Sequence, residues 1–125
     1  MQKILITANP IQIEAEPLNT PTARAIFKRL PIHSKARTWG EEIYFSTPID
    51  VPLEPDAKDV VEPGELAFWV EGHSIAIGFG RTPMSHDQEI RLATKTNIWA
   101  KALTDVKLLK AVKDGETISV ELIDS

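Results

Sequence analysis

Short segments in which apolar and polar side chains alternate recur along the 125-residue chain. Alternation places the apolar side chains on one face of a β-strand, so each segment predicts a strand with one buried face. The segments are KILITA, IQIEA, EIYFST, ELAFWV, SIAIGF, NIWAKALT and TISVELI. Many short strands of this kind are typical of a closed β-barrel.

The connections between these segments contain typical turn residues. Asn9-Pro10 and Glu71–His73 each join two segments and predict hairpins. IHSKART, at residues 32–38, predicts a polar and mostly exposed strand, and Gly40 is expected to break or bulge the chain after it. Residues 48–64 contain four prolines and five acidic residues, so they predict a long connection that its apolar residues anchor.

Two short helices are also predicted. The first is expected over residues 22–30, where Thr20 is a suitable N-cap and Pro21 a suitable first helical residue. Its apolar residues form one stripe with helical spacing: Ala23, Ile26, Phe27 and Leu30. The second is expected over residues 105–112, with Asp105 as its cap. We expect both helices to cover the ends of the barrel.

The composition is typical of one folded domain spanning residues 1–125, with 42% hydrophobic and 26% charged residues. The absence of cysteine excludes disulfides and thiolate metal sites. The three histidines form no closely spaced pair, so the sequence predicts no metal site and gives no sign of a cofactor.

The charge balance bears on partners and location. The net charge of −4 argues against a nucleic-acid partner, because phosphate binding usually needs a basic stripe. The longest apolar stretches, such as Leu66–Val70, are far shorter than the roughly 20 residues of a membrane span. The N-terminal segment has no signal-peptide pattern. We therefore expect a soluble, cytoplasmic protein, and the sequence leaves its oligomeric state open.

Three longer blocks carry a resemblance to a known family. They are TWGEEIYFSTP, VVEPGELAFWVEGHSIAIGFGRTPMS and NIWAKALTDVKLLKAVKDGETISVE. In this order they resemble a family of small bacterial and archaeal proteins called cyclophilin-like, over nearly the whole chain. The resemblance implies a mainly β fold, a closed eight-stranded barrel with two short helices capping its ends, rather than a particular activity.

The resemblance raises one enzymatic alternative. True cyclophilins are peptidyl-prolyl cis-trans isomerases and use an arginine in a Phe-His-Arg setting. Arg37 lies in the equivalent region, but no Phe-His precedes it, and EEIYFST replaces the Gln- and Gly-rich strand that follows. The sequence therefore keeps Arg37 as the candidate catalytic residue of an isomerase, predicts weak or absent activity, and leaves open whether the protein is an enzyme.

The adjacent acids Glu41 and Glu42 are the most informative polar pair. If the strand from Trp39 to Thr47 is regular, Glu41 shares the face of Trp39, and a bulge at Gly40 would exchange the two acids. A carboxylate there could bind a ligand. It could equally reach solvent, pair with an arginine, or accept backbone N–H bonds.

GFGRTPMS is the second candidate. Gly78 and Gly80 allow close backbone approach, and Arg81 could bind a carboxylate or phosphate, or form a surface ion pair. This turn is expected to lead into a polar stretch that ends near Thr96.

The leading hypothesis is a barrel that binds a small molecule or an extended peptide in a groove on its side. An interaction module in a larger assembly is a further alternative. The candidate ligand-binding residues are Trp39, Glu41, Glu42, Tyr44, Phe79, Arg81 and Met84. We expect one acid of the pair to line a pocket with Trp39, and Arg81 to close the same site.

Overall fold

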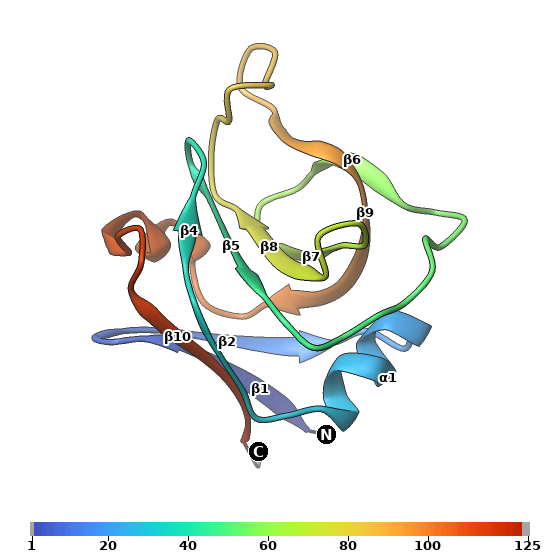
Figure 1. Cartoon of the computed structure of the whole chain (residues 1–125). Helices are drawn as coiled ribbons and strands as arrows, with labels where there is room; N and C mark the ends of the chain where they lie inside the picture. The colour runs from blue at the N-terminus through green and yellow to red at the C-terminus, as the bar shows by residue number, and fades with distance from the viewer. Residues whose placement is uncertain (1, 124–125) are drawn as a thin grey trace.

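Ten strands, one α-helix and one 3₁₀ helix make up residues 2–123, the part of the chain that the computed structural model describes (Figure 1). In chain order they are β1 (Lys3–Ala8), β2 (Ile11–Pro17), α1 (Pro21–Lys28), β3 (Ile32–Lys35), β4 (Arg37–Thr38), β5 (Glu42–Ser46), β6 (Lys58–Val61), β7 (Glu65–Trp69), β8 (Ser74–Gly78), β9 (Ile90–Ala102), the 3₁₀ helix η1 (Val106–Ala111) and β10 (Thr117–Ile123). The mainly β class predicted from the alternation is confirmed.

β3 and β4 join the two edges of the sheet. Hydrogen-bonded neighbours follow the order β3-β10-β1-β2-β9-β7-β8-β5-β4, and all of these pairs are antiparallel. β3 and β4 follow each other in the chain through Ala36, which is fully buried and donates its N–H to the Glu116 carbonyl at 2.8 Å. If β3 and β4 are counted as one bent strand, the described residues form a nearly closed barrel of eight strands. The predicted number of strands is therefore confirmed.

In residues 2–123, buried apolar side chains pack in two separate clusters. The larger fills the barrel interior. The smaller lies on the outer face of β7 and β8, where β6 and the first half of β9 cover the sheet (Figure 1). It contains Val61, Ala67, Ala76, Ile90 and Leu92. Because of this second layer, every residue of β8 is buried although the strand has two faces.

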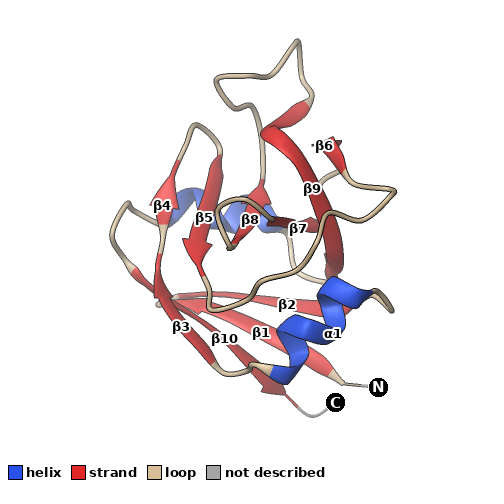
Figure 2. Ribbon diagram, turned by 45° about the vertical axis from the view of Figure 1, so that its right-hand side comes forward, coloured by secondary structure: helices blue, strands red, loops and turns tan. Residues whose placement is uncertain are grey.

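α1 begins as predicted and ends earlier. The Thr20 hydroxyl accepts the Ala23 N–H at 3.1 Å, and Pro21 is the first helical residue. The helix ends at Lys28 rather than at residue 30, and Phe27 is only partly buried, whereas Ile26 is fully buried. α1 lies at one end of the barrel, beside the connection between β5 and β6 (Figure 2).

The second predicted helix is a 3₁₀ helix, η1, and the Asp105 carboxylate caps it by accepting the Lys107 N–H at 3.0 Å. It lies on the other side of the barrel from α1 (Figure 1). Neither helix in residues 2–123 is long and apolar enough to cross a membrane.

The prediction of a polar stretch ending near Thr96 is wrong. β9 already begins at Ile90, and Ile90 and Leu92 pack on the outer face of β8 and β7. Leu66 pairs with Ala100 and Ala67 with Ile98, so Trp99 is an extra residue that forms a bulge in β9, and Trp99 and Ala100 are both buried.

Alternation along NIWAKALT predicts that Ile98, Ala100 and Ala102 point inward, and this prediction needs correction. Ala100 lies in the barrel core, and Ala102 packs against it only partly buried. Ile98 packs instead against the outer cluster. The row therefore does not keep to one face of the strand.

Asn97 ties the long connection between β5 and β6 to α1. Its amide nitrogen donates to the Thr22 hydroxyl at 2.9 Å and to the Pro52 carbonyl at 3.0 Å. Its amide oxygen accepts the Glu54 N–H at 2.8 Å, and the Glu54 carboxylate accepts from the Thr22 backbone. A buried polar network thus anchors this connection, in addition to the predicted apolar residues.

We expect Asn97→Ala to lower the free energy of unfolding by about 2 kcal/mol, because it leaves buried donors and acceptors without partners. Urea unfolding followed by circular dichroism measures the change. Asn19→Ala, at an exposed position, is the control. Equal costs for the two variants would contradict an anchoring role for Asn97.

Candidate ligand-binding site

A tight turn at Gly40-Glu41 decides where the two adjacent acids point. β4 ends at Thr38, the Trp39 N–H donates to the Glu42 carbonyl at 3.0 Å, and β5 begins at Glu42. Gly40 has a φ of +61°, and an added Cβ would lie 2.9 Å from the Pro83 Cδ. Glycine adopts such a backbone conformation without strain. The chain therefore breaks at Gly40, as expected, and the alternative of one regular strand from Trp39 to Thr47 does not hold.

The turn brings Glu42, rather than Glu41, beside Trp39. Thr38 pairs with Ile43, which places Trp39 and Glu42 opposite each other and on one face. Tyr44 follows on the same face by alternation. Ile43 and Phe45 point the other way and are fully buried in the barrel.

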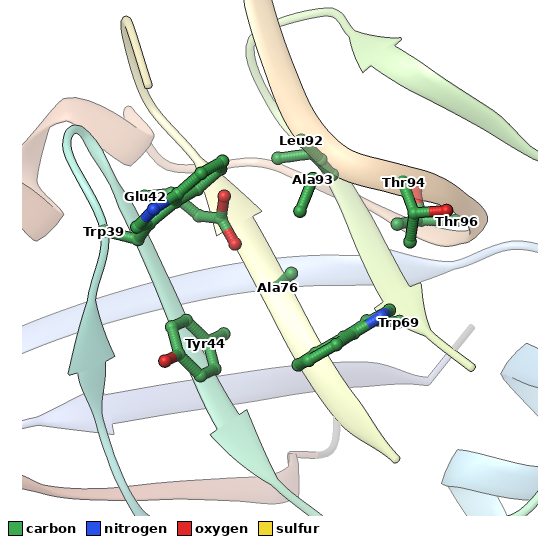
Figure 3. Close-up of a pocket in the computed structure, with 9 residues that line it drawn as sticks. All are labelled: Trp39, Glu42, Tyr44, Trp69, Ala76, Leu92, Ala93, Thr94 and Thr96. Carbon is green, nitrogen blue, oxygen red and sulfur yellow. The ribbon is translucent and has the colours of Figure 1, made fainter. Parts of the chain in front are cut away.

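These side chains line a pocket of about 120 Å³ on the outside of the barrel, under the first half of β9 (Figure 3). Its lining residues are Trp39, Glu42, Tyr44, Trp69, Ala76, Leu92, Ala93, Thr94 and Thr96. The small side chain of Ala76, which pairs with Tyr44, leaves room for this hollow. Tyr44 and Trp69 meet edge to face across this hollow, with ring centroids 6.1 Å apart.

Within residues 2–123, Glu42 is the one carboxylate in this lining. Its side chain points into the space between Trp39 and Trp69 (Figure 3). The residue is only 6% exposed, and its Oε1 is buried without a hydrogen-bond partner in residues 2–123. Burial disfavours the charged form and raises the pKa of Glu42 from 4.5 to about 7. The pocket therefore holds a group that can gain or lose a proton near neutral pH.

Arg81 does not reach this pocket. Its guanidinium donates to the carbonyls of Asp87 and Ser85. Glu41 extends across Gly80, where an added Cβ would lie 2.5 Å from its Oε1, and this oxygen accepts the Arg81 backbone N–H at 3.2 Å. The expectation that Arg81 closes the site of Trp39 is therefore wrong. Glu41, Phe79 and Arg81 line a separate depression with Lys107 and Lys110.

Two further candidates lie outside the pocket. Met84 is 49% exposed and is absent from the lining of both hollows within the described residues. Arg37 is exposed on β4, and its Nε lies 3.6 Å from the Asp114 carboxylate. In residues 2–123, no three His, Cys, Asp or Glu side chains gather as a metal site would require.

Six lining residues were not predicted: Trp69, Ala76, Leu92, Ala93, Thr94 and Thr96. Alternation along ELAFWV does place Trp69 on the face opposite Leu66 and Phe68, which was the one sequence signal for its position. The other five depend on β9 crossing over β8, for which the sequence gives no local signal.

The fold and the pocket together define a nearly closed antiparallel barrel with an aromatic pocket on its outer face. The chain matches the family model described as Cyclophilin-like over residues 2–121, and it belongs to that family. A similar solved structure is the hypothetical protein AF2241 from Archaeoglobus fulgidus, at 41% identity and a TM-score of 0.82, covering 96% of this chain and 93% of that one.

A more distant similarity supports the fold alone. It is to McbB, solved in complex with tryptophan, at 12% identity and a TM-score of 0.69. The match covers 97% of this chain and 44% of McbB. No curated protein matches the chain.

Proposed function

We propose that the protein binds a small organic molecule in the pocket between Trp39, Glu42 and Trp69. The observation that carries this proposal is the buried Oε1 of Glu42, which has no partner in the described residues. A buried polar atom without a hydrogen bond destabilises the fold by roughly 1–3 kcal/mol, so such atoms are rare outside functional sites. A ligand that donates to Glu42 would remove this cost.

The walls of the pocket support a small ligand rather than an extended peptide. Aromatic rings and aliphatic side chains provide most of the lining, with few polar groups, as in typical small-molecule sites. The volume of about 120 Å³ is close to that of a dry engineered cavity, about 150 Å³, that binds benzene. A single ring with a short substituent matches this space, whereas a peptide segment exceeds it.

The isomerase alternative receives no comparable support. An isomerase of the cyclophilin type needs its arginine beside an apolar proline pocket. Arg37 is exposed and lies near Asp114, and it is not among the residues that line the aromatic pocket.

We expect Ala76→Leu to weaken binding of a one-ring probe, benzyl alcohol, by about tenfold or more. The larger side chain fills the floor of the pocket, and overpacking costs about 1–3 kcal/mol. Trp39 and Trp69 line the pocket, so tryptophan fluorescence reports the titration. Ala111→Leu adds the same side chain at an exposed position of η1 and is the control.

Two results would count against the proposal. One is the absence of saturable binding of benzyl alcohol and benzylamine to the unaltered protein. The other is equal affinity in the unaltered protein and a folded Ala76→Leu variant, because the probe would then occupy another place.

A further inference from the structure

Among the described residues, no positively charged side chain of the pocket lining pairs with Glu42. Among residues 2–123, the polar groups of the lining besides Glu42 are the hydroxyls of Tyr44, Thr94 and Thr96 and the indole N–H groups of two tryptophans, and no lysine, arginine or histidine lies there. One of the hydroxyls is already used, since Thr96 donates to the Lys58 carbonyl at 2.9 Å. A cation that pairs with Glu42 must therefore come from outside the lining.

Two basic residues on the enclosing strands form ion pairs elsewhere, and the other two on β9, Lys95 and Lys101, are exposed and absent from the pocket lining. Arg91, on β9, pairs with Asp59 at 3.0 Å and with Glu89 at 2.6 Å. Lys58, on β6, pairs with Glu65 at 2.7 Å. Each would have to give up a formed ion pair in order to reach Glu42. A ligand cation meets no such competition.

The aromatic rings also favour a cation. Trp39, Tyr44 and Trp69 line the space into which the Glu42 carboxylate points (Figure 3). The faces of indole and phenol rings attract ammonium groups, most strongly where water is excluded. The net charge of −4 adds a weak general attraction for positive ligands. An anion, in contrast, would place a second negative charge beside a carboxylate that is already unpaired.

We propose that the ligand of this pocket is a small amine, which presents its ammonium group to Glu42 and its hydrocarbon part to Trp39, Tyr44 and Trp69. This inference rests on the proposed function and specifies its ligand class. A neutral donor satisfies one lone pair of Glu42, whereas an ammonium also neutralises its charge. A buried carboxylate destabilises the fold through its unpaired oxygen and through its uncompensated charge. Only a positively charged ligand removes both costs.

Matched probes of equal size test the charge requirement. Benzylammonium and benzyl alcohol differ in one terminal group, and both titrations are run at pH 8, where Glu42 is mainly ionised. We expect the ammonium to bind about tenfold or more tightly than the alcohol, the ratio that a hydrogen bond to a charged group provides. Glu42→Gln should bring the ratio close to one. Glu121→Gln, which removes an exposed charge from β10, should keep the ratio unchanged.

The outcomes separate the two proposals. If the alcohol binds the unaltered protein as tightly as the ammonium does, the pocket is a binding site but its ligand is not an amine. The same conclusion follows if the ratio survives in Glu42→Gln. If neither probe binds, the proposed function itself fails. Circular dichroism and alcohol binding show whether Glu42→Gln is folded, and the comparison in the unaltered protein tests the inference without any variant.

Discussion

Trp99→Ala should lower the free energy of unfolding by about 3–5 kcal/mol, the usual cost of removing a large ring from a packed core. Trp99 is 1% exposed and belongs to the cluster inside the barrel. Its Nε1 donates to the Ala67 carbonyl at 3.1 Å, across the bulge between β7 and β9. The substitution therefore leaves a cavity and an unpaired carbonyl in one place.

Urea unfolding followed by far-ultraviolet circular dichroism measures this loss without depending on tryptophan emission. Trp99→Phe keeps most of the ring volume and loses the hydrogen bond, so a smaller cost of about 1–2 kcal/mol is expected. Leu103→Ala, at a 53% exposed position just after β9, should change stability by about 0.5 kcal/mol or less. A cost for Trp99→Ala as small as that of Leu103→Ala would mean that β9 does not pack as described.

The elements that the sequence predicts well are those set by neighbouring residues. Alternation within a strand, the Asn9-Pro10 turn and the caps at Thr20 and Asp105 are all local features, and each is found as expected. The cyclophilin-like resemblance added the number of strands in the barrel and the placement of the two helices. Together, these two sources were enough to predict the fold.

The errors arose where distant segments decide the structure. The first half of β9 contains Arg91, Thr94 and Lys95, which hide the alternation of Ile90 and Leu92. These apolar residues are buried only because β9 crosses the outer face of β8. No window of local sequence contains that crossing, so the segment resembled a polar loop.

The register in which neighbouring strands pair determines which side chains line the pocket. A one-residue change in a hairpin exchanges the faces of a strand, and the turn at Gly40-Glu41 determines which acid is buried. The sequence indicated that one acid of the pair should be enclosed, and it left the choice open. The small side chain of Ala76, which pairs with Tyr44, then leaves room above the sheet, and three strands must be aligned before this room is visible.

The burial of Glu42 makes stability depend on pH in an unusual direction. Its pKa in the folded protein is about 7, above the ordinary value of 4.5, because burial disfavours the ionised form. Between pH 4.5 and about pH 7, the folded protein therefore binds more protons than the unfolded chain. Linkage then requires stability to fall as the pH rises through this range, and to change no further above it on account of this group.

We expect the stability of the unliganded protein relative to Glu42→Gln to fall by about 3 kcal/mol between pH 4 and pH 8, since one pKa unit corresponds to about 1.4 kcal/mol. Glutamine has nearly the same shape and cannot ionise, while the other titrating groups are shared by both proteins and cancel in the difference. Urea unfolding at a series of pH values provides the two curves, with Glu121→Gln as the control for a lost surface charge. Parallel curves would show that Glu42 is solvated in the folded protein. A stability difference that develops above pH 4.5 and levels off near pH 7 would identify the buried carboxyl of Glu42 as its source. A bound amine should then abolish this pH-dependent difference, because it supplies the missing cation.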